Sequence, residues 1–190
     1  MSEIRIGFAV TGSFCTFKAV FPQMELLVQK GYRVTPIMSQ NAYETDTRFG
    51  SAEGWIQKAE AITGEKVIHT IAQAEPIGPK KLLDLLIIAP CTGNTLGKLA
   101  GGIYDTAPTL AVKSHRRNER PVLIAVSTND ALAASAASIG ALMARKGIYF
   151  VPFEQDDCRG KPASCVADFE KILPAAVAAL EGRQLQPVIF

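Results

Sequence analysis

The sequence contains few of the residues that build metal centres or disulfide frameworks. Only four cysteines and two histidines occur among its 190 residues, and the cysteines are scattered without a C-x-x-C pair. This usage is typical of reduced thiols in a cytoplasm, so we expect neither disulfides nor a metal site. The net charge is only +2, and no basic segment is interleaved with aromatic residues. Composition therefore does not favour a nucleic-acid partner.

Long apolar segments are also absent. No apolar run approaches the roughly 20 residues that a membrane-spanning helix needs. The N-terminus lacks a basic region followed by an apolar stretch and a small-residue cleavage site, so no signal peptide is expected. Hydrophobic residues make up 48% of the chain and charged residues 20%, which is ordinary for an α/β protein. At this length we expect one domain, residues 1–190.

Strand-like and helix-like segments alternate along the whole chain. The expected strands lie near residues 4–10, 33–38, 84–89, 121–127 and 148–152, and the expected helices near 15–30, 51–62, 94–101, 105–116, 131–146 and 165–181. The strands are nearly continuous apolar runs, as in sheets covered on both faces. The sequence therefore predicts an α/β fold with a three-layer, doubly wound parallel sheet, flavodoxin-like or Rossmann-like.

The first predicted strand ends at a turn that suits a phosphate. Gly12 permits close approach of the backbone, and the Ser13 hydroxyl can bind a phosphate oxygen or cap a helix. No G-x-G-x-x-G fingerprint occurs, and the second strand ends at Ser39 without an acidic residue to hold a ribose hydroxyl. This edge of the sheet therefore favours a mononucleotide over NAD.

The third predicted strand delivers a polar turn to the start of a helix. Residues 82–89 are mostly apolar, and Pro90 then introduces a segment of small polar residues that includes Thr92 and Asn94. Backbone N–H groups at a helix N-terminus favour an anion. The alternative interpretation is that Thr92 or Asn94 only caps the helix.

Three of these segments, residues 10–13, Ser39 and residues 89–95, resemble the FMN-contacting segments of a flavoprotein family. Its members include phosphopantothenoylcysteine decarboxylase, lantibiotic cysteine decarboxylases and flavin prenyltransferases. The resemblance covers roughly residues 4–190. It implies that FMN is bound by Thr11, Gly12, Ser13, Phe14, Ser39, Pro90, Thr92, Gly93, Asn94, Thr95, Ser127 and Thr128.

Residues 47–50, 74–79, 127–132 and 151–157 are similar to one branch of that family. Its members are the flavoprotein-like B subunits of two-subunit enzymes that form dipicolinate in spore-forming bacteria. The resemblance implies a separate A subunit that binds NAD(P), a pyridine dicarboxylate that loses hydride, and the mother-cell cytoplasm as location. It also implies a homo-oligomer, a trimer or a dodecamer.

The chain departs from the decarboxylases of the family at their histidine. That histidine stands fourteen residues before the proline that corresponds to Pro90, and the matching position here is Pro76. Proline cannot transfer a proton, and His69 lies seven residues further upstream. We therefore interpret His69 as structural, and a stand-alone FMN-dependent decarboxylase becomes the alternative function. A non-catalytic, flavodoxin-like assembly module is a further alternative.

The expected substrate-binding residues are Asn129, Arg48, Arg159 and Lys161. Asn129 is the residue that the chain keeps from the decarboxylases' Pro-x-Met-Asn signature, and its alternative role is in a helix cap. Arg159 and Lys161 lie in the polar segment 154–162, which we expect to be a mobile flap. Its alternative is an ordinary solvated loop. The sequence singles out no catalytic acid or base.

Overall fold

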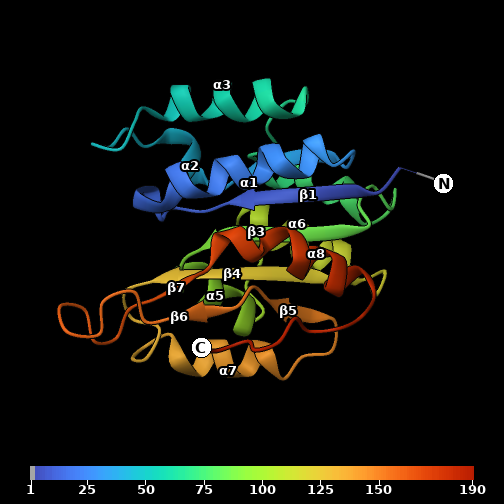
Figure 1. The fold of residues 1–190 in the computed structure, drawn as a ribbon. Helices are drawn as coiled ribbons and strands as arrows, with labels where there is room; N and C mark the ends of the chain where they lie inside the picture. Colours follow the sequence, from blue (N-terminus) through green and yellow to red (C-terminus); the bar gives the residue numbers. More distant parts are fainter. Residues whose placement is uncertain (1–2) are drawn as a thin grey trace.

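The computed structural model describes residues 3–190 and shows an α/β fold around a central seven-stranded sheet (Figure 1). Five strands are parallel: β1 (Arg5–Val10), β2 (Arg33–Met38), β3 (Leu85–Cys91), β4 (Val122–Thr128) and β5 (Ile148–Phe150). The strand order is β2-β1-β3-β4-β7-β6, with β5 also paired to β4. The predicted doubly wound α/β fold is confirmed.

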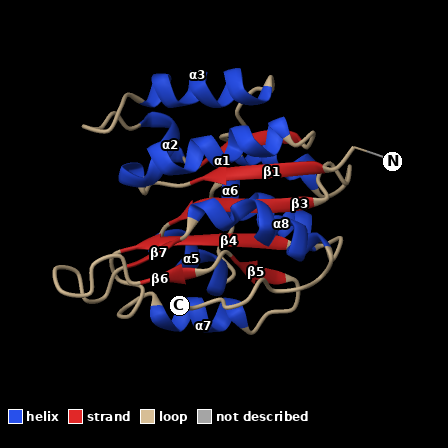
Figure 2. Ribbon diagram, viewed as in Figure 1, coloured by secondary structure: helices blue, strands red, loops and turns tan. Residues whose placement is uncertain are grey.

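Helices cover both faces of the sheet (Figure 2). Helices α1 (Phe17–Gln29) and α8 (Ile172–Leu180) pack on one face, and α3 (Ala52–Thr63) packs outside α1. The other face contacts α5 (Gly93–Ala100), α6 (Ala107–Arg116) and α7 (Ala136–Met143). Two short helices, α2 (Gln40–Glu44) and α4 (Ile71–Ala74), complete the layers.

Burial on both faces explains why the strands are continuous apolar runs. All seven residues of β3 are buried, as are five of the six in β1. Both strands lie inside the sheet with neighbours on each side, so alternate side chains contact helices of opposite layers.

The sheet departs from the prediction at its β4 edge. Two further strands, β6 (Phe153–Glu154) and β7 (Cys165–Ala167), form an antiparallel extension in which β7 pairs with the end of β4. The prediction of a helix from residue 165 is wrong for this segment, because α8 begins only at Ile172.

The helix predicted from residue 131 is also too long. Residues 129–134 form turns, and α7 begins at Ala136. The Asp130 carboxylate accepts hydrogen bonds from the hydroxyls of Thr128 and Ser135, which favours a compact turn over a helical one.

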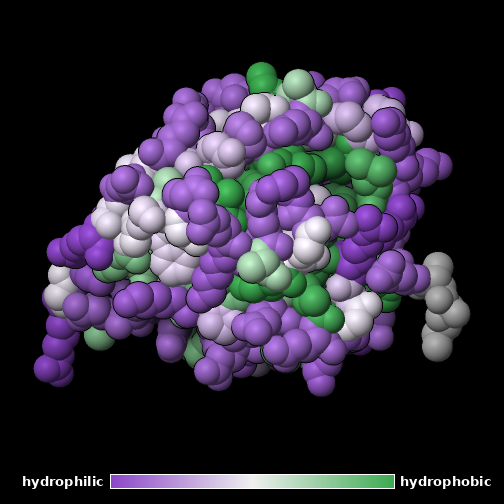
Figure 3. All heavy atoms as spheres, turned by 90° about the horizontal axis from the view of Figure 1, so that it is seen from above, coloured by the Kyte–Doolittle hydropathy of each residue, from purple (hydrophilic) through white to green (hydrophobic). Residues whose placement is uncertain are grey.

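The surface combines hydrophilic residues with a hydrophobic area. In the view of Figure 3, hydrophobic residues gather in a hollowed part of one face, surrounded by hydrophilic ones. In residues 3–190, no helix combines the length and the apolar composition required to cross a membrane.

Candidate functional site

The carboxyl ends of the parallel strands meet at one edge of the sheet, and two adjoining hollows lie there. The larger hollow has a volume of about 660 Å³. It is lined by Gly12, Ser13, Phe14, Cys15, Thr16, Phe49, Thr92, Gly93, Asn94, Ser127, Thr128, Asn129, Asp130, Asp156, Lys161, Ser164 and Val166. The smaller hollow, about 250 Å³, is lined by Thr11, Gly12, Ser39, Gln40, Asn41, Thr92, Asn94, Thr95, Lys98 and Thr106. Gly12, Thr92 and Asn94 line both, so the two hollows adjoin.

Buried hydrogen bonds join the ends of β1 and β3 between these hollows. The Thr11 hydroxyl donates to the carbonyl of Pro90 over 2.7 Å and accepts from the backbone N–H of Thr92 over 3.1 Å. Thr11 is almost fully buried, so both bonds are shielded from water. Pro90 itself is buried in β3, where its carbonyl positions Thr11.

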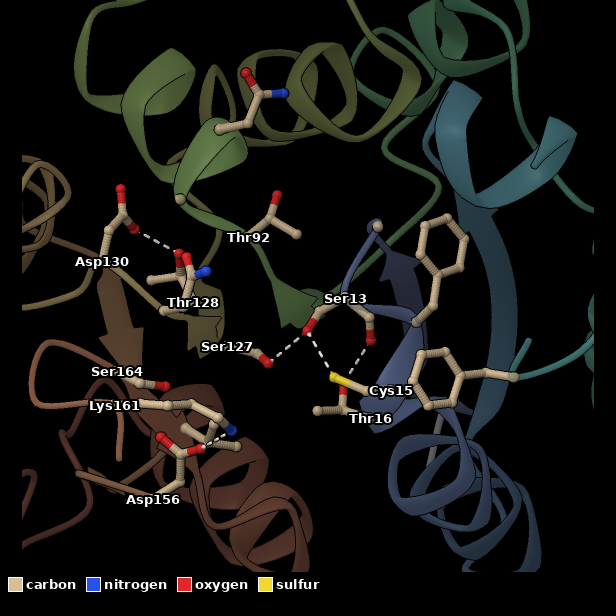
Figure 4. A pocket seen from close by; sticks show the side chains of 17 residues that line it. Ser13, Cys15, Thr16, Thr92, Ser127, Thr128, Asp130, Asp156, Lys161 and Ser164 are labelled. Atoms are coloured by element: carbon tan, nitrogen blue, oxygen red, sulfur yellow. Dashed lines mark hydrogen bonds and ion pairs between the residues drawn. The ribbon is translucent and has the colours of Figure 1, made fainter. Parts of the chain in front are cut away.

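The base of the larger hollow contains a pair of hydroxyls from two different strands (Figure 4). The Oγ atoms of Ser13, after β1, and Ser127, in β4, are 2.7 Å apart. They lie on either side of β3, the strand between them in the sheet. Cys15 follows on the same wall, with its Sγ atom 4.0 Å from Ser13 Oγ.

Two helix N-termini face the smaller hollow. The Ser39 hydroxyl accepts from the N–H of Ala42 and caps α2, and the Thr92 hydroxyl accepts from the N–H of Thr95 and caps α5. Capping was the alternative interpretation for Thr92, and the structure shows that cap. Asn94 lies in the first turn of α5 and is exposed to both hollows.

A second cluster supports the turn after β4. Asp130 Oδ1 accepts from Thr128 Oγ1 over 2.6 Å and from Ser135 Oγ over 2.8 Å. These hydrogen bonds, the one from Thr128 first, lower the pKa of Asp130. Gly93 packs directly against this cluster, because a Cβ atom there would lie within 2.8 Å of three of its oxygens. The cluster therefore fixes the backbone on both sides of Asn129.

The segment between β6 and β7 closes the far side of the larger hollow. Lys161 Nζ lies 3.3 Å from Asp156 Oδ2. Burial alone would raise the pKa of Asp156, but hydrogen bonds from Ser164 and Lys161 outweigh it and lower that pKa. The N–H of Leu132 donates to the carbonyl of Ala163, which ties this segment to the loop after β4.

The structure brings most of the predicted site residues to the two hollows. Of the twelve expected FMN contacts, all but the buried Pro90 line one of them. Asn129 and Lys161 line the larger hollow, whereas Arg48 and Arg159 line neither. The Arg48 guanidinium instead lies 4.9 Å from the ring centroid of Phe49, which does line the larger hollow.

His69 lies apart from both hollows. Its ring stacks on Tyr43 with the ring centroids 3.7 Å apart, in keeping with the structural role that the sequence suggested.

Several lining residues were not singled out in the sequence. Lys98 follows Asn94 by one turn of α5, and that spacing was an available signal. Phe49, Asp156 and Ser164 reach the larger hollow only through the path of irregular segments, which no periodicity indicates.

Comparison with known proteins defines the class to which this fold and site correspond. The Flavoprotein family model matches residues 1–175, and the chain belongs to that family. Within it, the chain is similar to the B subunit of dipicolinate synthase from Bacillus subtilis (strain 168), with 46% identity over 185 residues that cover 97% of this chain and 92% of that protein.

Solved structures agree with this placement. The crystal structure of the B subunit of dipicolinate synthase from Bacillus halodurans C matches with a TM-score of 0.91 and 44% identity, over 100% of this chain and 98% of that one. The FMN-dependent cysteine decarboxylase SpaF matches with a TM-score of 0.70 and 22% identity, over 94% and 98% of the two chains. The second likeness shows a shared fold.

Proposed function

We propose that this chain acts as the B subunit of a dipicolinate synthase, an oxidoreductase that forms dipicolinate together with an NAD(P)-binding A subunit. The observation that carries this proposal is the extent of the similarity. It spans the whole chain in the structural comparison, and so includes every segment that lines the two hollows. The substrate would be a dihydro- or hydroxytetrahydro-pyridine dicarboxylate, which becomes aromatic on losing hydride. The setting would be the mother cell of a sporulating bacterium.

The residues of the two hollows fit FMN. The smaller hollow offers hydroxyls from Ser39, Thr92 and Thr95, a donor set suited to a phosphate. The Lys98 ammonium also lines it and pairs with Asp105 over 2.7 Å. The larger hollow offers apolar surface from Phe14, Phe49 and Val166, suited to a flat ring. Bound FMN would supply a group that accepts hydride and passes it on.

The protein's own part in this reaction would be to hold the dicarboxylate in the larger hollow. Asn129 can donate a hydrogen bond to one carboxylate, and Lys161 can pair with the other. Arg48 and Arg159, which line neither hollow, remain candidates for attracting the dianion toward the opening.

Two observations weigh against the stand-alone decarboxylase. No histidine lines either hollow in residues 3–190. The resemblance to the decarboxylases places Pro76 where they carry their histidine. The histidine that serves as the acid-base group of those decarboxylases is therefore missing from these linings.

The test uses the purified chain with and without its A subunit. We expect the chain to show a flavin absorption spectrum after addition of FMN, and to form dipicolinate only when the A subunit and NAD(P) are present. Flavin binding with decarboxylation of a cysteine-containing substrate by the chain alone would instead support the decarboxylase. Neither flavin binding nor an effect on dipicolinate formation would support the assembly module.

We further propose that the chain assembles with itself, as a trimer or a dodecamer. The hydrophobic area of Figure 3 supports this proposal, because apolar surface of that kind is typical of contacts between protein chains. Light scattering at micromolar concentration would measure the assembly, and a monomer would contradict it.

A further inference from the structure

The larger hollow contains two negative charges and one positive charge in residues 3–190. Asp130 and Asp156 are the carboxylates, and Lys161 is the cation. The lining is therefore net negative, and Lys161 is its one cation available to pair with a ligand that carries two carboxylates. This makes the partner of Lys161 decisive for what the hollow can hold.

The two aspartates differ in how firmly they are held. Asp130 accepts hydrogen bonds from two hydroxyls of its own turn, and neither of these donors is a cation. Asp156 pairs with Lys161 across 3.3 Å, and the Lys161 side chain is 58% exposed. A long, half-exposed ion pair of this kind is weak, so a competing carboxylate can replace it.

Asp156 stays in contact with water when Lys161 leaves. Its side chain is 28% exposed in the ion pair, so water can solvate the carboxylate that Lys161 releases. Releasing Lys161 therefore does not leave a fully buried, unpaired carboxylate, which would otherwise oppose the exchange.

The backbone around Lys161 is fixed, so the exchange needs only a side-chain movement. The N–H of Lys161 donates to the carbonyl of Asp157, and its own carbonyl accepts from the N–H of Ser164. The bond from Leu132 to Ala163 anchors the same segment to the loop that carries Asn129. These hydrogen bonds hold the backbone at Lys161 and at the β7 end of the segment, and the Lys161 side chain extends from them to Asp156.

From this geometry, and resting on the function proposed above, we infer that Lys161 and Asp156 select dicarboxylates. Lys161 exchanges Asp156 for one carboxylate of the ligand, while the other carboxylate is held nearer Asn129. A ligand with a single carboxylate, held at Asn129, leaves the Asp156–Lys161 pair intact and gains nothing from Lys161. Asp156 is then a specificity-determining residue, and Lys161 a substrate-binding one.

The test compares two aromatic ligands, pyridine-2,6-dicarboxylate and pyridine-2-carboxylate. Their dissociation constants are measured by calorimetry on the full-length chain in the presence of FMN, without the A subunit. We expect Lys161→Met to weaken dicarboxylate binding about tenfold and to leave monocarboxylate binding nearly unchanged. Asp156→Asn should tighten dicarboxylate binding, and the double variant should behave like Lys161→Met alone.

Lys80→Met is the matched control, because Lys80 is exposed and lines neither hollow. It removes the same charge and should leave both constants unchanged. Thermal melts of every variant establish that each is folded. The inference is overturned if Lys161→Met weakens the binding of both ligands equally, or if it weakens the binding of neither. It is also overturned if the unaltered chain does not bind the dicarboxylate. A lack of dipicolinate formation with the A subunit, beside the expected binding contrast, would count against the proposed function alone.

Discussion

At the scale of single residues, the site depends on close contacts that leave no room for larger side chains. Gly93 begins α5 and also lies against the turn after β4, so one position joins two of the loops that line the larger hollow. A Cβ atom there would be 2.5 Å from Ser135 Oγ and 2.8 Å from both Asp130 Oδ1 and Thr128 Oγ1. The three oxygens are held by hydrogen bonds to one another and cannot easily move apart.

We therefore expect Gly93→Ala to lower the free energy of unfolding by about 1–3 kcal/mol, through overpacking. Gly97→Ala is the control in the same helix, because the nearest atom to its Cβ would be 4.0 Å away. That change should stabilise the chain by roughly 0.5–1 kcal/mol, since alanine favours helix. Urea denaturation measures both, and equal effects of the two substitutions would refute the contact.

At the scale of the elements, charges fix the edge of the sheet opposite the site. Asp84, directly before β3, accepts from Nε and a terminal nitrogen of Arg5 and also from Arg120. Arg5 begins β1 and Arg120 precedes β4, so one carboxylate joins three neighbouring strands. Burial would raise the pKa of Asp84, but the two arginines, Arg5 first, hold it below its usual value.

Asp84→Asn should lower stability by about 1–3 kcal/mol at pH 7, because hydrogen bonds to a charged group are lost. The folded pKa lies below that of the unfolded chain, so this stabilisation is present above about pH 4 and is lost as the pH falls further. The difference between variant and parent should therefore shrink in acid. Lys66→Met, which breaks an ion pair whose lysine is 90% exposed, should cost much less stability than Asp84→Asn. A similar loss in both variants would contradict this account.

The elements also show what could be predicted from the sequence. The buried strands and helices α3 and α6 follow from apolar runs and helical spacing, and the residues directly after those strands do line the hollows. The antiparallel pair β6 and β7 could not be predicted, because two- and three-residue strands have no periodicity of their own. Asp156 and Ser164 reach the site only through that pair, so the partner of Lys161 was not foreseen either.

At the scale of the whole molecule, one buried histidine makes the stability of the fold depend on pH. His115 is almost fully buried near the end of α6, with Nε2 2.9 Å from the carbonyl oxygen of Pro121. Burial lowers the pKa of His115 from 6.5 to about 4. Between these two values the unfolded chain binds a proton that the folded chain does not, so stability falls as the pH falls.

The difference in pKa corresponds to a loss on the order of 3 kcal/mol between about pH 6.5 and pH 4. His115→Gln should make the unfolding free energy less dependent on pH in this window. His69→Gln is the control, because it leaves the buried imidazole of His115 in place. Its unfolding free energy should depend on pH as that of the parent chain does. Urea midpoints recorded from pH 7 to pH 4 provide the measurement, and an equally steep profile for His115→Gln would show that another group is responsible.

The hydroxyl pair at the base of the larger hollow has one further consequence. The hydroxyls of Ser13 and Ser127 each carry one hydrogen and two acceptor lone pairs, and either can be the donor across their 2.7 Å contact. One hydrogen lies between the two oxygens, which leaves the other free for whatever occupies the hollow. Rotation of two side-chain bonds reverses the arrangement without moving the backbone. A ligand atom that accepts a hydrogen bond when oxidised and donates one when reduced would find a complementary partner at the same point in both states.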